Sequence, residues 1–122
     1  MSRQFKKDSA VTVVATAPIT KHRFVSYNGQ HTPGTADSAE KDCQGIAEES
    51  AAKDEAVAVV TGYSYLLEVS EAVTFGAYVK PASDGTGRGA VGTLTDHCGR
   101  ALSAATGAGQ LIECQIVKHV HA

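Results

Sequence analysis

Residues 43 to 81 constrain the fold most, because short apolar segments alternate there with turn residues. Residues 56 to 61 form a continuous apolar run of strand length, and Gly62 is predicted to break it. In residues 63 to 69 apolar and polar side chains then alternate, which is the pattern of a β-strand with one buried face. Tyr63 and Tyr65 are therefore predicted to share a buried face.

The rest of the chain continues this pattern, with β-branched or alternating segments separated by Gly, by Pro and by the Asn28-Gly29 pair, which is predicted to be a turn. Further strands are predicted at residues 11–17, 24–27, 43–48, 75–80 and 111–120, with a weak strand at 91–95 and a strand or short helical piece at 100–105. Residues 85–89 (GTGRG) lack the Lys-Ser/Thr ending of a phosphate-binding loop and are predicted to be a hairpin turn. These elements predict an all-β fold, a small β-barrel or β-sandwich of about eight short strands.

The chain has 122 residues, which suits one domain. Residues 1–10 are predicted to be a flexible basic N-terminal arm, and residues 11–122 a single β domain. Residues 1–27 carry five basic groups and one acid, whereas residues 28–55 carry two basic groups and seven acids. This contrast can pair subunits or simply mark two solvated surfaces. The candidate interface with a partner or with another subunit comprises Arg3, Phe5, Lys6, Lys7, Tyr63 and Tyr65.

Charge and hydropathy argue against several classes of partner. The net charge of −2 gives no reason to expect nucleic acid, and no apolar run approaches the roughly 20 residues of a membrane helix. The first ten residues lack the apolar core of a signal peptide, and three cysteines without paired spacing favour a reducing compartment.

Two alternatives remain open at this point. A metal-binding or enzymatic β domain would use His97, Cys98, His119 and His121, although no Cys pair accompanies these residues and no orienting group is placed beside them. We therefore predict no catalytic residues, no metal site and no cofactor. An adhesin would display residues 30–42, the longest polar stretch, since loops of this length are disordered or functional.

Several segments together resemble the decoration or cement proteins of tailed-phage capsids, a family formerly described as a domain of unknown function. The likeness runs through most of residues 11–118 as a rhythm of Gly, Ala and Val. The segments that carry it are Gly45-Ile46-Ala47, the strand at 55–61, GYSYLLEV at 62–69, residues 71–79, Gly99-Arg100-Ala101-Leu102 and residues 111–117.

The resemblance implies a structural virion protein rather than an enzyme. It would bind the major capsid protein on the outer surface of an expanded icosahedral shell and stabilise that shell. Assembly of the virion would take place in the host cytoplasm. It also implies a homo-oligomer, most often a trimer. Residues 1–10 would become ordered on the capsid by adding to a neighbouring sheet edge or by pairing with acidic groups.

Overall fold

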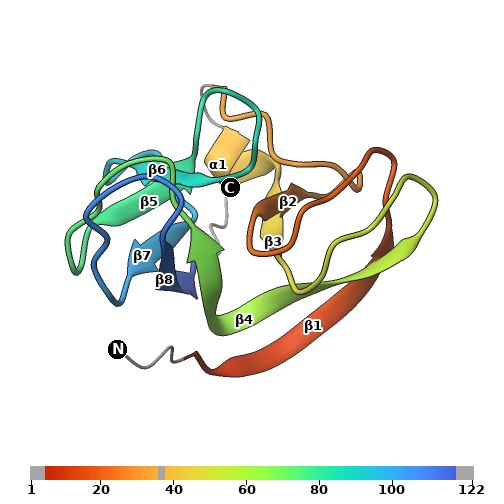
Figure 1. Cartoon of the computed structure of the whole chain (residues 1–122), viewed down its shortest axis with the longest axis horizontal. Helices are drawn as coiled ribbons and strands as arrows, with labels where there is room; N and C mark the ends of the chain where they lie inside the picture. The colour runs from red at the N-terminus through yellow and green to blue at the C-terminus, as the bar shows by residue number, and fades with distance from the viewer. Residues whose placement is uncertain (1–4, 36–37, 118–122) are drawn as a thin grey trace.

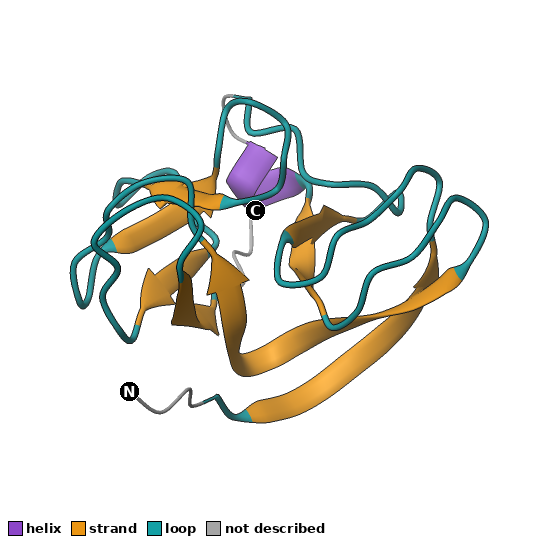
Figure 2. Ribbon diagram, in the orientation of Figure 1, coloured by secondary structure: helices purple, strands orange, loops and turns teal. Residues whose placement is uncertain are grey.

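The computed structural model describes residues 5–35 and 38–117. Within them the chain forms eight strands and one helical turn, which confirms the predicted small all-β fold (Figures 1 and 2). The elements are β1 (Lys7–Val14), β2 (Phe24–Ser26), α1 (Ser38–Lys41), β3 (Cys43–Ala47), β4 (Ala56–Glu68), β5 (Tyr78–Pro81), β6 (Gly89–Val91), β7 (Gly99–Ala101) and β8 (Leu111–Ile116).

The strands form one sheet that nearly closes on itself. Its order is β2-β3-β4-β8-β7-β5-β6, and β1 pairs with β4 beside this path. At the end of β4, Val69 forms a bridge with Gly89 of β6, and Ser70 donates its backbone N–H to the Gly89 carbonyl at 2.8 Å. The second half of β4 therefore closes a small barrel with β5 to β8, at the left of Figure 1.

Strand β4 is the spine of the molecule, and it corrects the prediction that Gly62 interrupts it. The strand runs unbroken for 13 residues, pairing first with β1 and β3 and then with β8. Gly62 lies at the junction of these two pairings, beside two register shifts opposite β1. A register shift bends a strand and changes which side chains face inward, so glycine here permits a bend rather than a break.

This bend also overturns the prediction of a shared tyrosine face. Tyr65 is 8% exposed, whereas Tyr63 is 44% exposed. The next positions, Ser64, Leu66 and Leu67, are all buried, because both faces of the second half of β4 are covered. Strict alternation fails there for that reason.

Two apolar clusters fill the fold. They lie on opposite faces of the part of the sheet formed by β2, β3 and the first half of β4. Phe24, Ile46 and Val60 belong to the larger cluster, which continues into the barrel through Leu67 and Ile112. The smaller cluster lies on the opposite face and contains Ala15, Ile19, Val25, Ala47, Ala51, Val57 and Val59. No helix in the described ranges is long and apolar enough to span a membrane.

Other boundaries also differ from prediction. Phe75 is 72% exposed in a turn, so β5 begins only at Tyr78. The predicted strand at 91–95 is instead the end of β6 and a turn, whereas residues 82–88 join β5 to β6 as the predicted hairpin connection. The segment at 100–105 contributes only β7, and β8 ends at Ile116, with Val120 outside the described residues.

Candidate interaction surface

The N-terminal segment is fixed against β4 by a small set of contacts. The Phe5 ring meets the Tyr65 ring edge-on, with centroids 4.7 Å apart. The Lys6 backbone N–H donates to the Ser64 hydroxyl at 2.8 Å, and the Lys6 carbonyl accepts from the Ser64 N–H at 2.9 Å. Ser64 in turn donates its hydroxyl to Glu113 of β8 at 2.7 Å. We call Phe5, Lys6, Ser64 and Tyr65 the N-terminal clasp.

Charge adds to the clasp at the start of β1. The Lys7 ammonium lies 2.9 Å from the Glu48 carboxylate, and this hydrogen-bonded ion pair raises the pKa of Lys7. Burial, together with the Glu48 charge, raises the pKa of Tyr65 above its ordinary value. Tyr65 therefore stays a neutral phenol at physiological pH, and its ring serves as packing surface for Phe5.

Strand β1 is an exposed edge strand. Seven of its eight residues are exposed, and only Val13 is half-buried. The exposed residues include the apolar Val11, at 40%, and Val14, at 60%. Because only Val13 packs against the core, the strand is held mainly by backbone pairing with β4. Edge strands of this length and exposure are templates for pairing with another chain.

The direction of the backbone groups shows which part of this edge is open. Ala15 donates its N–H to the Glu55 carbonyl at 2.9 Å, and the register continues through Val13 opposite Val57. Because backbone polar groups alternate along a strand, those of Ala10 and Thr12 point away from β4. No hydrogen bond from another described residue reaches them. Farther along, Gly29 lies against the Val14 carbonyl and covers the edge.

The structure brings four of the six predicted interface residues together. Phe5, Lys6, Lys7 and Tyr65 lie around the clasp, with Tyr63 exposed next to it. Arg3 is outside the described residues. Residues 7–10, which were assigned to the arm, form the first half of β1. Whether the arm is a separate flexible unit stays a prediction.

The alternative metal or nucleophile set is only partly described. His97 and Cys98 are buried, and the His97 Nδ1 atom lies 3.0 Å from the Thr93 carbonyl. Burial raises the pKa of the Cys114 thiol well above its ordinary value. Among the residues described, no group of three or more His, Cys, Asp or Glu side chains could hold a metal ion. His119 and His121 lie outside that set.

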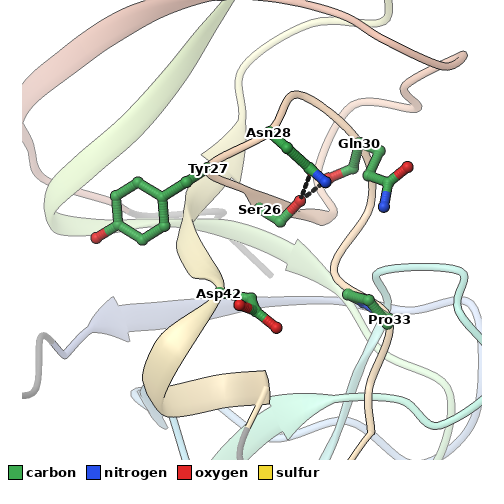
Figure 3. A pocket seen from close by; sticks show the side chains of 6 residues that line it. All are labelled: Ser26, Tyr27, Asn28, Gln30, Pro33 and Asp42. Carbon is green, nitrogen blue, oxygen red and sulfur yellow. Dashed lines mark hydrogen bonds between the residues drawn. The ribbon is translucent and has the colours of Figure 1, made fainter.

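A pocket of about 220 Å³ opens between the end of β2 and the end of α1 (Figure 3). Its lining is Ser26, Tyr27, Asn28, Gln30, Pro33 and Asp42. The sequence marked Asn28-Gly29 as a turn and residues 30–42 as a polar stretch, but it did not single out these residues. The pocket forms only because α1 returns Asp42 beside β2, where its carbonyl accepts from the Tyr27 N–H at 3.1 Å.

Comparison with known proteins identifies the family. The family model described as phage cement protein matches residues 4–116. The chain belongs to the phage cement protein family. Its fold is similar to that in the crystal structure of the head fiber gp8.5 N base of bacteriophage phi29, with a TM-score of 0.65 and 17% identity over 93% of this chain and 98% of that chain. No curated protein matches the chain significantly.

Membership of the cement family confirms the resemblance found in the sequence and makes the chain a structural protein associated with the phage capsid. The family match covers the clasp, β1 and the pocket alike, whereas most of the C-terminal tail, with His119 and His121, lies beyond it. The likeness to the phi29 chain, at 17% identity, shows the fold alone.

Proposed function

We propose that this cement protein binds the outer surface of the expanded icosahedral capsid and stabilises the shell, without catalytic activity and without a cofactor. Its partner is the major capsid protein, and it acts as a homotrimer on virions assembled in the host cytoplasm. The match of residues 4–116 to the cement family carries this proposal.

The surface that makes the contact comprises β1 and the N-terminal clasp. The outward backbone groups of Ala10 and Thr12 are available to a partner strand, and β-strand addition takes its affinity from such groups. Lys6 is exposed at the same end and is paired with the exposed Asp8 carboxylate at 3.5 Å, a weak surface pair that an acidic partner segment could replace. In free protein β1 pairs with its own β4, so on the capsid the segment offers its outer edge rather than leaving its own sheet.

A proline at position 12 tests this surface. The Thr12 N–H points away from β4, so Thr12→Pro removes an outward donor and no β1–β4 hydrogen bond. We expect the variant to fold with nearly unchanged thermal stability and to bind undecorated expanded capsids about tenfold more weakly. Bound copies per hexamer would be measured by sedimentation and quantitative gel analysis.

The matched control is Leu94→Ser, which removes an apolar side chain that is 69% exposed in a distant turn. It should bind like the wild type. Full binding by Thr12→Pro would refute the role of the β1 edge, whereas failure of the wild-type protein to bind any capsid would refute the proposed function itself.

A further inference from the structure

The pocket between the end of β2 and Asp42 has the character of a small-ligand site. Figure 3 shows Asn28 and Gln30 above the opening, Asp42 and Pro33 below it, and Tyr27 at its left edge with the ring extending outward. Its volume of about 220 Å³ is below the range of about 300–1,000 Å³ typical of drug-sized ligands, so it suits a single small ring.

The wall formed by residues 26–30 is held rigidly before any ligand arrives. The Ser26 N–H donates to the Gln30 carbonyl at 2.8 Å, and the Ser26 hydroxyl lies within hydrogen-bonding distance of both the same carbonyl, at 3.0 Å, and the Asn28 side-chain oxygen. Thr16 bonds this turn from outside, through the carbonyls of Asn28 and Gly29. A preformed wall lowers the entropy cost of binding.

Gly29 fixes the turn further. Its φ of +84° favours glycine, and a Cβ atom there would lie 2.4 Å from the Val14 carbonyl oxygen. The turn is therefore packed directly onto the end of β1, and the side chains of Asn28 and Gln30 project from a fixed backbone.

Hydrogen-bonding groups remain available around the opening. The Asp42 carboxylate, the Gln30 amide and the Asn28 amide nitrogen make no side-chain hydrogen bond to any other residue that the structure describes. Asp42 is exposed, and Tyr27 keeps 60% of its surface exposed. The pocket thus offers acceptors, donors and one apolar ring face with no partner inside the chain.

The carboxylate, the two amides and the aromatic ring together favour one class of ligand over others. An anion would meet the Asp42 carboxylate without a cation to balance it in the lining, and a metal ion would find one carboxylate and no second charged ligand. Neighbouring hydroxyls of a sugar are donors and acceptors together, which suits a carboxylate beside two amides. A sugar ring also has an apolar C–H face, which fits the exposed face of an aromatic ring.

We propose that this pocket binds one neutral saccharide unit, with Asp42, Asn28 and Gln30 holding its hydroxyls and Tyr27 covering one ring face. The site is independent of the β1 edge, because it uses none of the residues of β1 or the N-terminal clasp. A capsid-bound cement protein would thereby also display a carbohydrate-binding site.

NMR titration of the full chain tests this site with four probes: the methyl glycosides of glucose, galactose and mannose, and N-acetylglucosamine. At least one should shift the backbone amides of Tyr27, Gln30 and Asp42 and saturate with a Kd of about 1 mM, as expected for a shallow single-sugar site. Absence of such shifts with all four sugars up to about 20 mM would overturn the proposal.

Two variants check the roles of the side chains. Tyr27→Ala and Asp42→Asn should each weaken binding about tenfold, since one removes the stacking surface and the other the charged acceptor. Both side chains are exposed, so both variants should fold. Phe75→Ala removes an aromatic ring that is 72% exposed elsewhere and should leave the Kd unchanged. Equal binding by all three variants would show that the sugar lies elsewhere and would refute the site.

Discussion

Replacing Gly45 with alanine should destabilise the protein severely, although the change adds one methyl group. Gly45 lies in β3 at its closest approach to β4. A Cβ atom there would lie 2.1 Å from the Val60 carbonyl oxygen and 3.0 Å from the Val59 side chain. The first distance is about 1.3 Å short of the 3.4 Å at which ordinary contact begins, and the obstacle is backbone, which cannot rotate away.

The free-energy cost follows from what must move. Separating β3 from β4 by more than 1 Å disrupts the pairing of Ile46 with Val60 and of Ala47 with Val59, where both clusters are closely packed. Overpacking costs about 1–3 kcal/mol, and each weakened backbone hydrogen bond adds about 1 kcal/mol. We therefore expect a loss of about 3–5 kcal/mol in the free energy of unfolding.

Urea unfolding followed by circular dichroism measures this loss. With a slope of about 2 kcal/mol per molar urea, the midpoint should fall by about 2 M. Gly62→Ala is the matched control, because its Cβ would meet the Ser9 hydroxyl at 3.1 Å, the end of a side chain that can rotate, and the Asp8 Cβ atom at an ordinary contact distance of 3.8 Å. Its free energy should change by less than about 1 kcal/mol. A Gly45→Ala midpoint as high as that of Gly62→Ala would refute the close-approach argument.

Three further predictions concern other groups. Burial lowers the pKa of His31, whose Nε2 atom accepts from the Thr20 N–H at 3.1 Å, so protonation costs stability in the folded state. Because the unfolded chain binds the proton more readily, stability should fall as pH drops below 6.5, and thermal melts of His31→Ala should lose that part of the slope. The three cysteines are buried, so a thiol reagent should react with them slowly in native protein and rapidly in denaturant; one fast equivalent in native protein would contradict this. Phe5→Ala should speed hydrogen exchange at the Lys6 and Ser64 amides about tenfold by removing the ring contact with Tyr65, and leave the Leu67 amide unchanged; equal acceleration at all three would mean that the clasp is not a local unit.

Local patterns in the sequence predicted much of the fold. The β-branched and alternating segments predicted strands at residues 24–27, 43–48 and 111–120, where the structure has β2, β3 and β8, and the glycines of residues 85–89 predicted a hairpin connection. These signals depend on neighbours only a few residues away. They also gave the class of the fold, because several short strands joined by turns leave few architectures other than a barrel or sandwich.

The misplaced features depend on contacts far apart in the chain. Gly62 looks like a strand breaker until β1 is placed beside it, more than 50 residues earlier in sequence. Residues 7–10 resemble a loose arm because all four are exposed and cover no core, so their side chains do not alternate between apolar and polar. The sugar pocket needs Asp42 beside Tyr27, a contact that α1 creates.

Two glycines of this chain have a packing role rather than a chemical one. Gly45 in β3 and Gly99 in β7 each begin a Gly-x-Ala segment, and each lies close to a neighbouring strand. A Cβ atom on Gly45 would strike the Val60 carbonyl. A Cβ atom on Gly99 would lie 2.5 Å from the Cys114 sulfur and 2.8 Å from the Gln115 carbonyl. Such positions set how closely strands approach and say nothing of what the surface binds. Substitutions there should therefore change stability. Substitutions at the β1 edge or around the pocket should change partners instead, because those segments cover little of the core.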